Sequence, residues 1–487
     1  MITIIFGRAA QFVLALMMMR VATTLLSPEE MGRVSLVVTT TACFSMFLIN
    51  PVGMFINRRL HSWQANGMAR HYLMHYVRHL LLVALIAGIT LLVFERFINF
   101  GLSINWLIML VCGSLLFNTI NHTAIPSLNL LGFNGKFVLL TLATIATSFF
   151  CATLLVYSLQ FSAQYWLLGL IFGQALLGIV GTRVLFTQLK KTEDAPPLRV
   201  IRTPHLRTLF HFAWPVALAA GLSWVQGQGY RYLLEGQLGL SQLGLFVAGY
   251  GISAAMIVGF ESVLTTYFQP HLYRDANQND AAQQAQAWQT YAAAVIPSLL
   301  LTIALIIFLA PELTRIFLGE AFQAAAPFVI WGALAEAMRV LAGVYSLIAH
   351  VYMQTRWLVL PNVVGAALSI GSCLILIPQF GAMGAGMGLV FSGFVVVMMM
   401  HILLIRRVGG GVPLRPLLAS GIAAVVLWGM AHVLHSLLNV ASWRAVVGTL
   451  VPVGVAYLCL QYLLLRQHLA YGAMRDRNEN MTQVIRK

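Results

Sequence analysis

Long apolar runs make up most of the chain, and short polar segments separate one run from the next. Each run is long enough to form a membrane-spanning helix, which needs about 20 apolar residues to cross the hydrocarbon layer. The pattern therefore predicts an all-α polytopic membrane protein with about fourteen transmembrane helices. We place these helices approximately at residues 3–26, 32–56, 75–96, 105–127, 137–158, 165–186, 210–234, 243–266, 286–309, 325–350, 357–377, 383–405, 416–438 and 445–466.

The composition supports a membrane protein and excludes a soluble one. Apolar residues make up 60% of the chain and charged residues 9%, against about 45–50% and about 25% in soluble domains. Little chain remains for a soluble catalytic domain. We find no paired carboxylates, nucleophile triad or nucleotide-binding loop, and the five cysteines lie in apolar runs without metal-ligand spacing. The sequence therefore predicts a transporter and not an enzyme, with no catalytic residue, cofactor or metal site.

The basic residues are divided unequally between the two sides of the predicted membrane. The chain carries 29 Lys and Arg against 14 Asp and Glu, a net charge of +15. With the N-terminus in the cytoplasm, 21 of the 29 lie in cytoplasmic loops and helix ends, four lie on the opposite side and four lie within helices. Such residues accumulate on the cytoplasmic side of membrane proteins. The bias predicts that both termini are cytoplasmic, and it explains the basic charge without nucleic acid as a partner.

The longest hydrophilic stretch lies at 187–209 and divides the chain into groups of helices. Six predicted helices precede this stretch, six follow it, and a final pair completes the chain. The predicted divisions are an N-terminal six-helix lobe at 1–186, a cytoplasmic inter-lobe linker at 187–209, a C-terminal six-helix lobe at 210–405, two extra transmembrane helices at 406–466 and a basic cytoplasmic tail at 467–487.

Two helix–turn segments resemble each other across this linker. In the first, Arg20 lies within a helix, 12 residues before Gly32 at the opening of the next helix. In the second, Arg231 lies 13 residues before Gly244. Because six is an even number, equivalent helices of the two lobes would cross the membrane in the same direction. We therefore predict a parallel repeat about an axis along the membrane normal.

Three segments resemble polysaccharide-transporter flippases of the multidrug/oligosaccharidyl-lipid/polysaccharide (MOP) superfamily. The segment LILIPQFGAMGAGMGLVFSG at 374–393 resembles the LIPxxGxxGA signature of these proteins. RVATTLLSPEEMGRVSLV at 20–37 resembles the turn between their first two helices, and FAWPVALAAGLSW at 212–224 is similar to their entry to helix 7. The resemblance is strongest to O-antigen (Wzx-type) flippases. Independently of the family, Pro378 is predicted to end a helix, and the glycines after it permit close contact between helices.

The resemblance implies a flippase that works by alternating access in the bacterial inner membrane. Its substrate would be an undecaprenyl-pyrophosphate-linked oligosaccharide, either an O-antigen or an exopolysaccharide repeat unit, moved from the cytoplasmic to the periplasmic leaflet. The bilayer, a polysaccharide polymerase and a chain-length regulator are the further partners it implies. Two alternatives from the same superfamily are a multidrug/cation antiporter and a lipid II flippase. A membrane polysaccharide polymerase or ligase is disfavoured, because no long periplasmic loop is predicted.

Ionisable residues inside a membrane are costly, so they are candidates for functional sites. A guanidinium is always charged and presents a planar fork of donors that matches phosphate oxygens, which suits the implied pyrophosphate. Two simpler interpretations stay open: Arg339 can pair with Glu336 three residues before it, and Arg231 can extend to the membrane surface near Glu235. The predicted substrate-binding residues are Arg8, Arg20, Arg231, Arg339, Gln226, Gln228, Tyr230 and Trp224.

Two further groups of residues complete the prediction. Glu261 and Glu336 are candidates for coupling transport to an H⁺ or Na⁺ gradient, and a membrane potential that acts directly on the translocated charge is the alternative. Asn57, Arg58 and Arg59 lie where a lipid head group would enter from the inner leaflet. The accumulation of basic residues on the cytoplasmic side accounts for these two arginines equally well.

Overall fold

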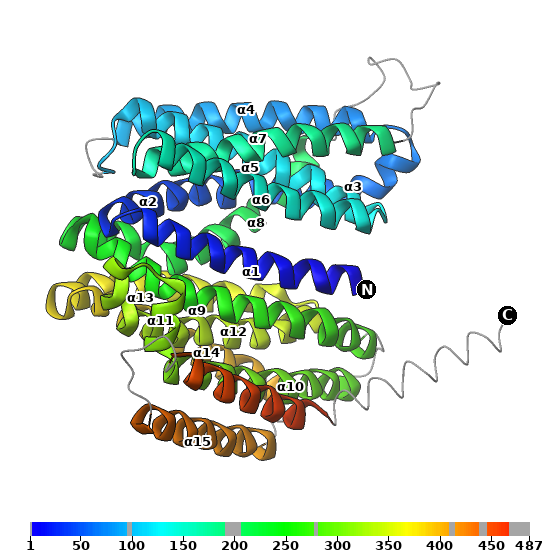
Figure 1. Cartoon of the computed structure of the whole chain (residues 1–487). Coiled ribbons are helices and arrows are strands. Elements are labelled where there is room, and N and C mark those ends of the chain that lie inside the picture. Colours follow the sequence, from blue (N-terminus) through cyan, green and yellow to red (C-terminus); the bar gives the residue numbers. More distant parts are fainter. Residues whose placement is uncertain are drawn as a thin grey trace. The chain divides into compact units, whose positions relative to one another are not determined.

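The computed structural model describes residues 2–94, 100–189, 206–276, 281–408, 414–437 and 446–466. Most of the predicted linker and the whole basic tail lie outside these ranges. Helices joined by short turns make up the described residues, which contain no strand (Figure 1). The helices are α1 (Ile2–Leu25), α2 (Pro28–Phe44), η1 (Ser45–Ile49), α3 (Asn50–Ala65), α4 (Ala69–Phe94), α5 (Ile104–Leu130), α6 (Asn134–Ser158), α7 (Ala163–Gln188), α8 (Leu206–Gln228), α9 (Tyr230–Ala276), α10 (Ala281–Phe308), α11 (Ala310–Phe317), η2 (Glu320–Ala325), α12 (Ala326–Val351), η3 (Thr355–Leu358), α13 (Val359–Phe380), α14 (Ala382–Val408), α15 (Leu414–Leu437) and a last helix over Val446–Arg466.

The helices confirm the predicted all-α polytopic membrane protein. Within the described residues, twelve segments are long and apolar enough to cross a membrane, and a shorter apolar helix covers Ala9–Leu25. One of the twelve, Arg207–Ala276, has 70 residues and holds two spans, because the backbone of Gly239 (φ 83°) interrupts the helical conformation inside α9. With that division, the described chain has about fourteen spans, as the hydropathy pattern predicts.

Several helices extend beyond the apolar runs that predict them. The helix predicted over 32–56 begins at Pro28 and continues through η1 and α3 to Ala65. The helix predicted over 243–266 continues to Ala276, and α11 and η2 occupy a segment expected to be a loop. Polar helical turns give no hydropathy signal, because they do not need to cross the hydrocarbon layer.

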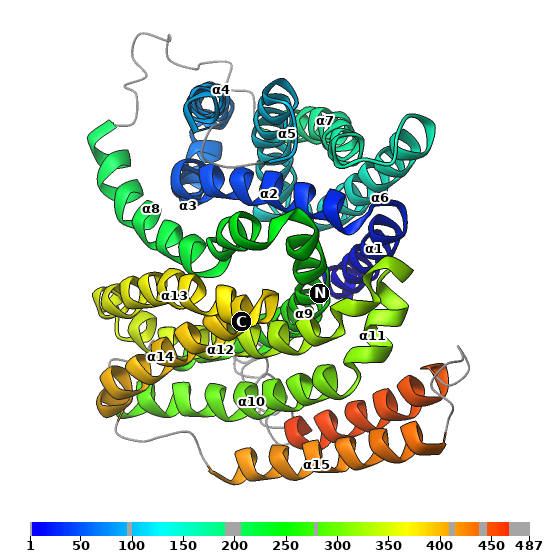
Figure 2. The same cartoon turned by 90° about the vertical axis from the view of Figure 1, so that its left-hand side faces the viewer.

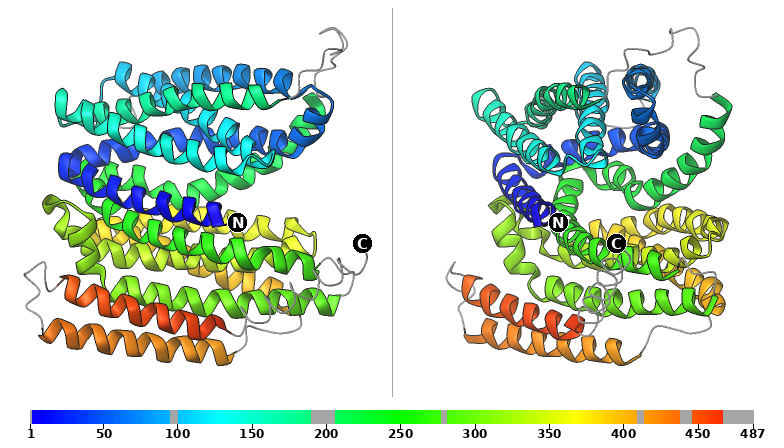
Figure 3. Two further views of the ribbon diagram at one scale, coloured as in Figure 1. Left: turned by 45° about the vertical axis from the view of Figure 1, so that its right-hand side comes forward. Right: turned by 90° about the vertical axis from the view of Figure 1, so that its right-hand side faces the viewer.

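The helices pack into two compact units, which we describe separately. Unit 1 comprises Met1–Ala248, Leu318–Phe322 and Ser369–Ala385, and unit 2 comprises Gly249–Phe317, Gln323–Leu368 and Gly386–Lys487. In unit 1, α5, α6 and α7 lie side by side (Figure 2). In unit 2, α15 and the last helix lie beside α10 (Figure 3).

The turn before α2 determines where two helices of unit 1 begin. The Ser27 hydroxyl accepts the backbone N–H of Glu30 at 3.3 Å, and Pro28 occupies the first turn, both of which favour the start of a helix. The Glu30 carboxylate pairs with Arg33 and accepts the backbone N–H of Ala163 at 2.6 Å, at the first residue of α7. A carboxylate satisfies a helix N-terminal N–H group that has no partner inside its own helix.

Two glycines allow α2 and α9 to cross in contact within unit 1. A Cβ atom on Gly32 would lie 2.1 Å from the carbonyl oxygen of Leu240, and one on Gly244 would lie 1.8 Å from the carbonyl oxygen of Pro28. The contact is reciprocal, since each glycine meets the carbonyl of the residue four positions before the other glycine. Equivalent helices that meet at a repeat axis make contacts of this kind, so the crossing supports the predicted parallel repeat.

The glycine-rich segment also brings helices close together, as predicted. A Cβ atom on Gly384 would lie 2.2 Å from the carbonyl oxygen of Leu376, at the hairpin between α13 and α14. The prediction that Pro378 ends the preceding helix is wrong, because Pro378 lies inside α13 and the helix continues to Phe380. The turn comes instead at Gly381, whose φ of 62° is readily adopted only by glycine.

Candidate functional site

Polar side chains of α2 and α9 meet inside unit 1. Arg231, in the first turn of α9, donates from Nη1 to the Thr39 hydroxyl at 2.8 Å. The next residue, Tyr232, shares a hydrogen bond of 2.7 Å with the Thr40 hydroxyl. The two threonines come from a run of three in α2, so a local cluster of hydroxyls in a membrane-spanning helix provides the acceptors for the side chains of α9.

Aromatic rings of α8 and η1 extend this cluster. Trp224 donates its indole N–H to the carbonyl oxygen of Thr39 at 3.2 Å, and its ring lies 6.1 Å from that of Tyr232. Phe47 meets Trp224 edge-on at 6.5 Å. Phe47 belongs to η1, a π-helical turn that precedes Pro51, and single π-helical turns often occur at functional sites. The rings thus surround the polar contact between α2 and α9.

The charge of Arg231 has no acidic partner in this arrangement. Arg231 is half-buried, and its partners are the Thr39 hydroxyl and Tyr230, whose ring centroid lies 5.8 Å from the guanidinium. Among the residues that the structure describes, no carboxylate lies within ion-pair distance of Arg231, not even that of Glu235 one turn further along α9. A partly desolvated guanidinium with spare donors favours an anion, and phosphate oxygens fit its fork.

The other predicted substrate-binding residues of unit 1 differ in how far they are buried and therefore in whether a ligand can reach them. Tyr230 is fully buried, and its ring packs edge-on against Phe246 at 5.2 Å. Because Arg231 donates to the Tyr230 hydroxyl at 3.4 Å, this tyrosine positions the arginine and lacks an exposed surface for a ligand. Gln226 and Gln228 are half-buried near the end of α8. The carbonyl oxygen of Gln226 accepts the Ser369 hydroxyl at 2.7 Å.

The remaining predicted residues of unit 1 lie on α1 and α3. Arg20 is half-buried in α1, and its carbonyl oxygen accepts the Thr24 hydroxyl at 2.7 Å. The side chain of Arg8 lies outside the described part of the chain. On α3, the predicted entry residues Asn57, Arg58 and Arg59 are all exposed. This part of the chain forms a helix and not a loop, so its basic groups project from a fixed backbone.

A second polar cluster joins α9 and α12 inside unit 2. Arg339 donates from Nε to one oxygen of Glu336 at 2.6 Å and from Nη2 to one oxygen of Glu261 at 2.7 Å. The Tyr250 hydroxyl donates to the other oxygen of Glu336 at 2.6 Å. The Glu336–Arg339 pair is the one that i,i+3 spacing predicts, whereas Glu261 joins it from another helix. Two carboxylates share one guanidinium, so the ionised cluster carries one excess negative charge.

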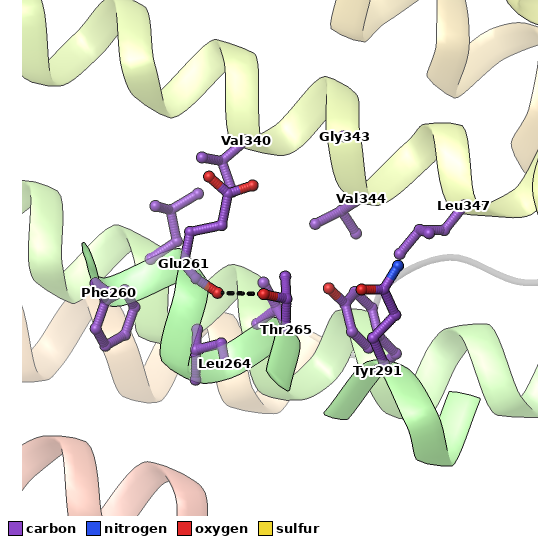
Figure 4. A pocket seen from close by; sticks show the side chains of 12 residues that line it. Phe260, Glu261, Leu264, Thr265, Tyr291, Val340, Gly343, Val344 and Leu347 are labelled. Carbon is purple, nitrogen blue, oxygen red and sulfur yellow. Dashed lines mark hydrogen bonds between the residues drawn. The ribbon is translucent and has the colours of Figure 1, made fainter. Parts of the chain in front are cut away.

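A pocket of about 250 Å³ lies next to this cluster, between α9, α10 and α12. Glu261 and Thr265 line it from α9, Tyr291 lines it from α10, and Val340 and Val344 line it from α12 (Figure 4). Most of the remaining lining is aliphatic. The pocket therefore has one polar face, and the Glu261 carboxylate belongs to that face.

Sequence reasoning included the charged residues of both clusters and missed the neutral groups that hydrogen-bond to them or to their neighbours. Thr39, Thr40 and Tyr250 were not predicted, although three consecutive threonines in a membrane-spanning helix are a detectable signal. A contact between His435 and a buried glutamate in unit 2 was also missed. His435 of α15 lies 2.5 Å from the carboxylate of Glu312, a side chain that is only 1% exposed. No periodicity along the chain relates these two positions, because they lie on different helices, α11 and α15.

Comparison with protein families finds a match over residues 21–327 to the family described as "Polysaccharide biosynthesis protein". A search of curated proteins finds no match. Among solved structures, the chain is similar to the lipid II flippase MurJ in an inward closed conformation. The TM-score is 0.66 at 14% sequence identity, and the alignment covers 96% of this chain and 99% of that one.

The chain is also similar to multidrug resistance MATE family transporters of the MOP superfamily. An inward-facing structure gives a TM-score of 0.64 at 16% identity and covers 82% of this chain and 94% of that one. An outward-facing structure gives 0.54 at 13% identity, covering 84% and 93%. At these identities the likeness shows a common fold, the fold of MOP transporters that the sequence predicts.

Proposed function

This chain belongs to the polysaccharide biosynthesis protein family, and we propose that it flips an undecaprenyl-pyrophosphate-linked oligosaccharide across the bacterial inner membrane. The cargo is an O-antigen or exopolysaccharide repeat unit, which moves from the cytoplasmic to the periplasmic leaflet by alternating access. The observation that carries the proposal is the half-buried guanidinium of Arg231, which has no acidic partner in the described residues. An uncompensated cation within a membrane-spanning segment suits the pyrophosphate of a lipid-linked sugar.

The surroundings of Arg231 suit the rest of such a cargo. Thr39 and Tyr230 hold the arginine through neutral groups, so a diphosphate can add its negative charge without displacing a carboxylate. Trp224, Gln226 and Gln228 follow one another near the end of α8, and indole rings and amides bind sugar faces and hydroxyls. Arg20 and Arg8 on α1 are the further candidates for phosphate contact. The exposed residues Asn57, Arg58 and Arg59 serve as the inner-leaflet entry.

Coupling to an ion gradient is assigned to Glu261 and Glu336. Their shared partner Arg339 leaves the cluster with excess negative charge, so binding of H⁺ or Na⁺ would neutralise it. A membrane potential acting on the translocated charge is the alternative source of energy. Separate replacement of each glutamate by glutamine, assayed after a pH jump or a Na⁺ jump, tests the assignment. If coupling is unchanged in both variants, neither glutamate takes part in it.

The same negative cluster is the reason to retain a second candidate function. An antiporter of cationic drugs needs acidic groups in its binding site, and Glu261 and Glu336 would supply them. Transport of lipid II is a third candidate, which differs from the first only in the glycan. Under the first and third functions, the pyrophosphate of a lipid-linked glycan binds Arg231. A cationic drug would be repelled by that charge and would not bind there. A polysaccharide polymerase and a chain-length regulator are the protein partners expected under the first function.

Complementation tests the proposed function. A strain that lacks its lipid-linked oligosaccharide flippase receives the wild-type chain, Arg231→Ala or Arg231→Lys at matched membrane abundance. We expect the wild type to restore surface polysaccharide, alanine to abolish it and lysine to restore it in part. Arg183→Ala is the matched control, because Arg183 is an exposed arginine on α7 outside the cluster. If Arg231→Ala restores surface polysaccharide as well as the wild type does, the proposed flippase function stands and the proposed role of Arg231 in it is rejected.

A loss of function by Arg20→Ala or Arg339→Ala would extend the substrate site beyond Arg231. Arg339→Ala also leaves two carboxylates without their shared partner. Its effect therefore has to be compared with that of the double variant in which Glu261 is also replaced by glutamine. If the wild-type chain fails to complement while it confers efflux of cationic dyes, the antiporter function replaces the flippase.

A further inference from the structure

The hydrogen bonds of the unit 2 cluster leave one carboxylate oxygen without a donor. Arg339 donates to one oxygen of Glu336 and to one oxygen of Glu261. Tyr250 donates to the second oxygen of Glu336. In the described part of the chain, no side chain or backbone group donates to the second oxygen of Glu261, Oε1. The excess negative charge of the cluster is therefore least compensated on Glu261, the glutamate that lines the pocket.

The polar face of the pocket continues away from Glu261 along α9. Thr265 and Gln269 follow Glu261 at four-residue intervals, and all three line the pocket. The first and the third of these residues are eight positions apart, about 12 Å along the helix axis, so the three side chains do not converge on one metal ion. Tyr291 lines the pocket from α10 and lies beside Thr265 (Figure 4). A volume of about 250 Å³ has room for several water molecules.

We propose that this pocket is a hydrated route by which a proton reaches Oε1 of Glu261 from the aqueous phase. A proton needs only one free carboxylate oxygen, whereas Na⁺ needs several oxygen ligands around a single point. The route supplies such oxygens one after another, about 6 Å apart along the helix axis, so a bridging water molecule is needed between consecutive groups. Aliphatic side chains, including Val295, Leu299 and Val344, form most of the rest of its lining.

The protonation step balances in charge. An excess proton, carried along the route as hydronium, binds Oε1 of Glu261, which becomes a neutral carboxylic acid and leaves a neutral water molecule behind. Arg339 keeps its ion pair with Glu336, so the cluster changes from one excess negative charge to neutral. The groups that face Glu261 are Arg339 and Glu336 from α12 and Tyr291 from α10, with Tyr250 beyond Glu336. Glu261 gains the proton because Glu336 already has two donors.

Gly343 provides a way to close the route without moving the backbone. It lines the pocket from α12, and a Cβ atom added there would meet nothing within 4 Å. A leucine at this position would extend into the space that the waters need. Gly429 on α15 also has no atom within 4 Å of an added Cβ, and it lies outside the pocket. Gly429→Leu is therefore a matched control for Gly343→Leu.

Cysteine labelling measures access to the route without relying on transport. In the full chain with its five cysteines replaced, Thr265→Cys is exposed in membrane vesicles to a small cationic methanethiosulfonate and to an anionic one. We expect the cationic reagent to react at least tenfold faster, because the neighbouring cluster is negative. Gly343→Leu is expected to slow this labelling at least tenfold, and Gly429→Leu to leave it unchanged. Val263→Cys is the control on the same helix. Val263 is 61% exposed but lies outside the pocket within a predicted membrane span, so we expect it to face lipid and to react with neither of the water-soluble reagents.

That transport needs this route rests on the proposed function, and complementation measures it separately from labelling. In the complementation assay, Gly343→Leu is expected to lose transport that Gly429→Leu retains, with both proteins monodisperse in detergent. Unreactive Thr265→Cys, labelling that Gly343→Leu does not slow, or undiminished transport by Gly343→Leu would each overturn the proposal. Transport that follows a Na⁺ gradient at constant pH would overturn it as well. A wild type that fails to complement rejects the flippase, while the labelling result still decides whether the route exists.

Discussion

Replacement of Gly244 by alanine is expected to destabilise unit 1, although alanine normally favours a helix. The added Cβ would lie 1.8 Å from the carbonyl oxygen of Pro28 and 2.9 Å from the nitrogen of Gly32. Carbon and oxygen ordinarily approach to about 3.3–3.6 Å, so α2 and α9 must separate by about 1.5 Å at their crossing. Such overpacking costs about 1–3 kcal/mol, and the better helix propensity of alanine returns only up to about 1 kcal/mol.

Thermal unfolding of the detergent-solubilised protein measures this effect. We expect Gly244→Ala to lower the midpoint, and Gly429→Ala, where an added Cβ meets nothing, to leave it unchanged or raise it. Gly32→Ala is expected to resemble Gly244→Ala, since its Cβ would lie 2.1 Å from a carbonyl oxygen. The double variant should cost less than both single effects together, because one separation of the helices relieves both contacts. A midpoint for Gly244→Ala at or above that of the wild type would refute the reasoning.

Three more outcomes follow from the contacts. His435→Ala should lower stability by about 1–3 kcal/mol, because it removes the polar group nearest to the buried Glu312 carboxylate, and adding Glu312→Gln should recover part of that loss in the same thermal assay. Trp288→Ala should cost about 3–5 kcal/mol, because Trp288 is fully buried in the core of unit 2 and donates to a carbonyl at 2.9 Å; Trp288→Phe should cost less. Thr39→Val keeps the shape but removes the acceptor of Arg231, so it should weaken complementation less than Arg231→Ala does, at unchanged protein abundance.

Hydropathy predicted the spans well because the membrane imposes a minimum length on each of them. It could not predict the polar helical turns at the ends of the spans, such as the end of α3 near Ala65 and the end of α9 near Ala276. These turns continue the helix of the adjacent span. They do not have to cross the hydrocarbon layer, so their side chains do not have to be apolar. The start of α2 was predictable in principle, because Ser27 and Pro28 form a recognised helix-start pattern.

The candidate sites were predictable only as far as their residues share a helix. The spacing of Glu336 and Arg339 predicts an i,i+3 pair, and the pair is present at 2.6 Å. Glu261 reaches the same arginine from 78 positions away, and Thr39 reaches Arg231 from 192 positions away. Which faces of two helices meet depends on packing across the whole unit, and a single sequence without its packing does not contain that information.

The two polar clusters show why charges counted along the sequence say little about the cargo. In the interiors of the predicted helices, four arginines stand against Glu261 and Glu336, with Glu235 just beyond a helix end, a balance that leans only slightly toward an anion once all three glutamates are counted. In the structure, Arg339 is shared by two carboxylates, whereas Arg231 contacts only hydroxyls and a ring. Charges compensate each other only at short range, so a near-zero sum is compatible with an uncompensated cation in unit 1 and an excess negative charge in unit 2. Under the proposed function, the anionic cargo and the proton bind to different groups, because a guanidinium and a carboxylate in direct contact would neutralise each other and bind neither.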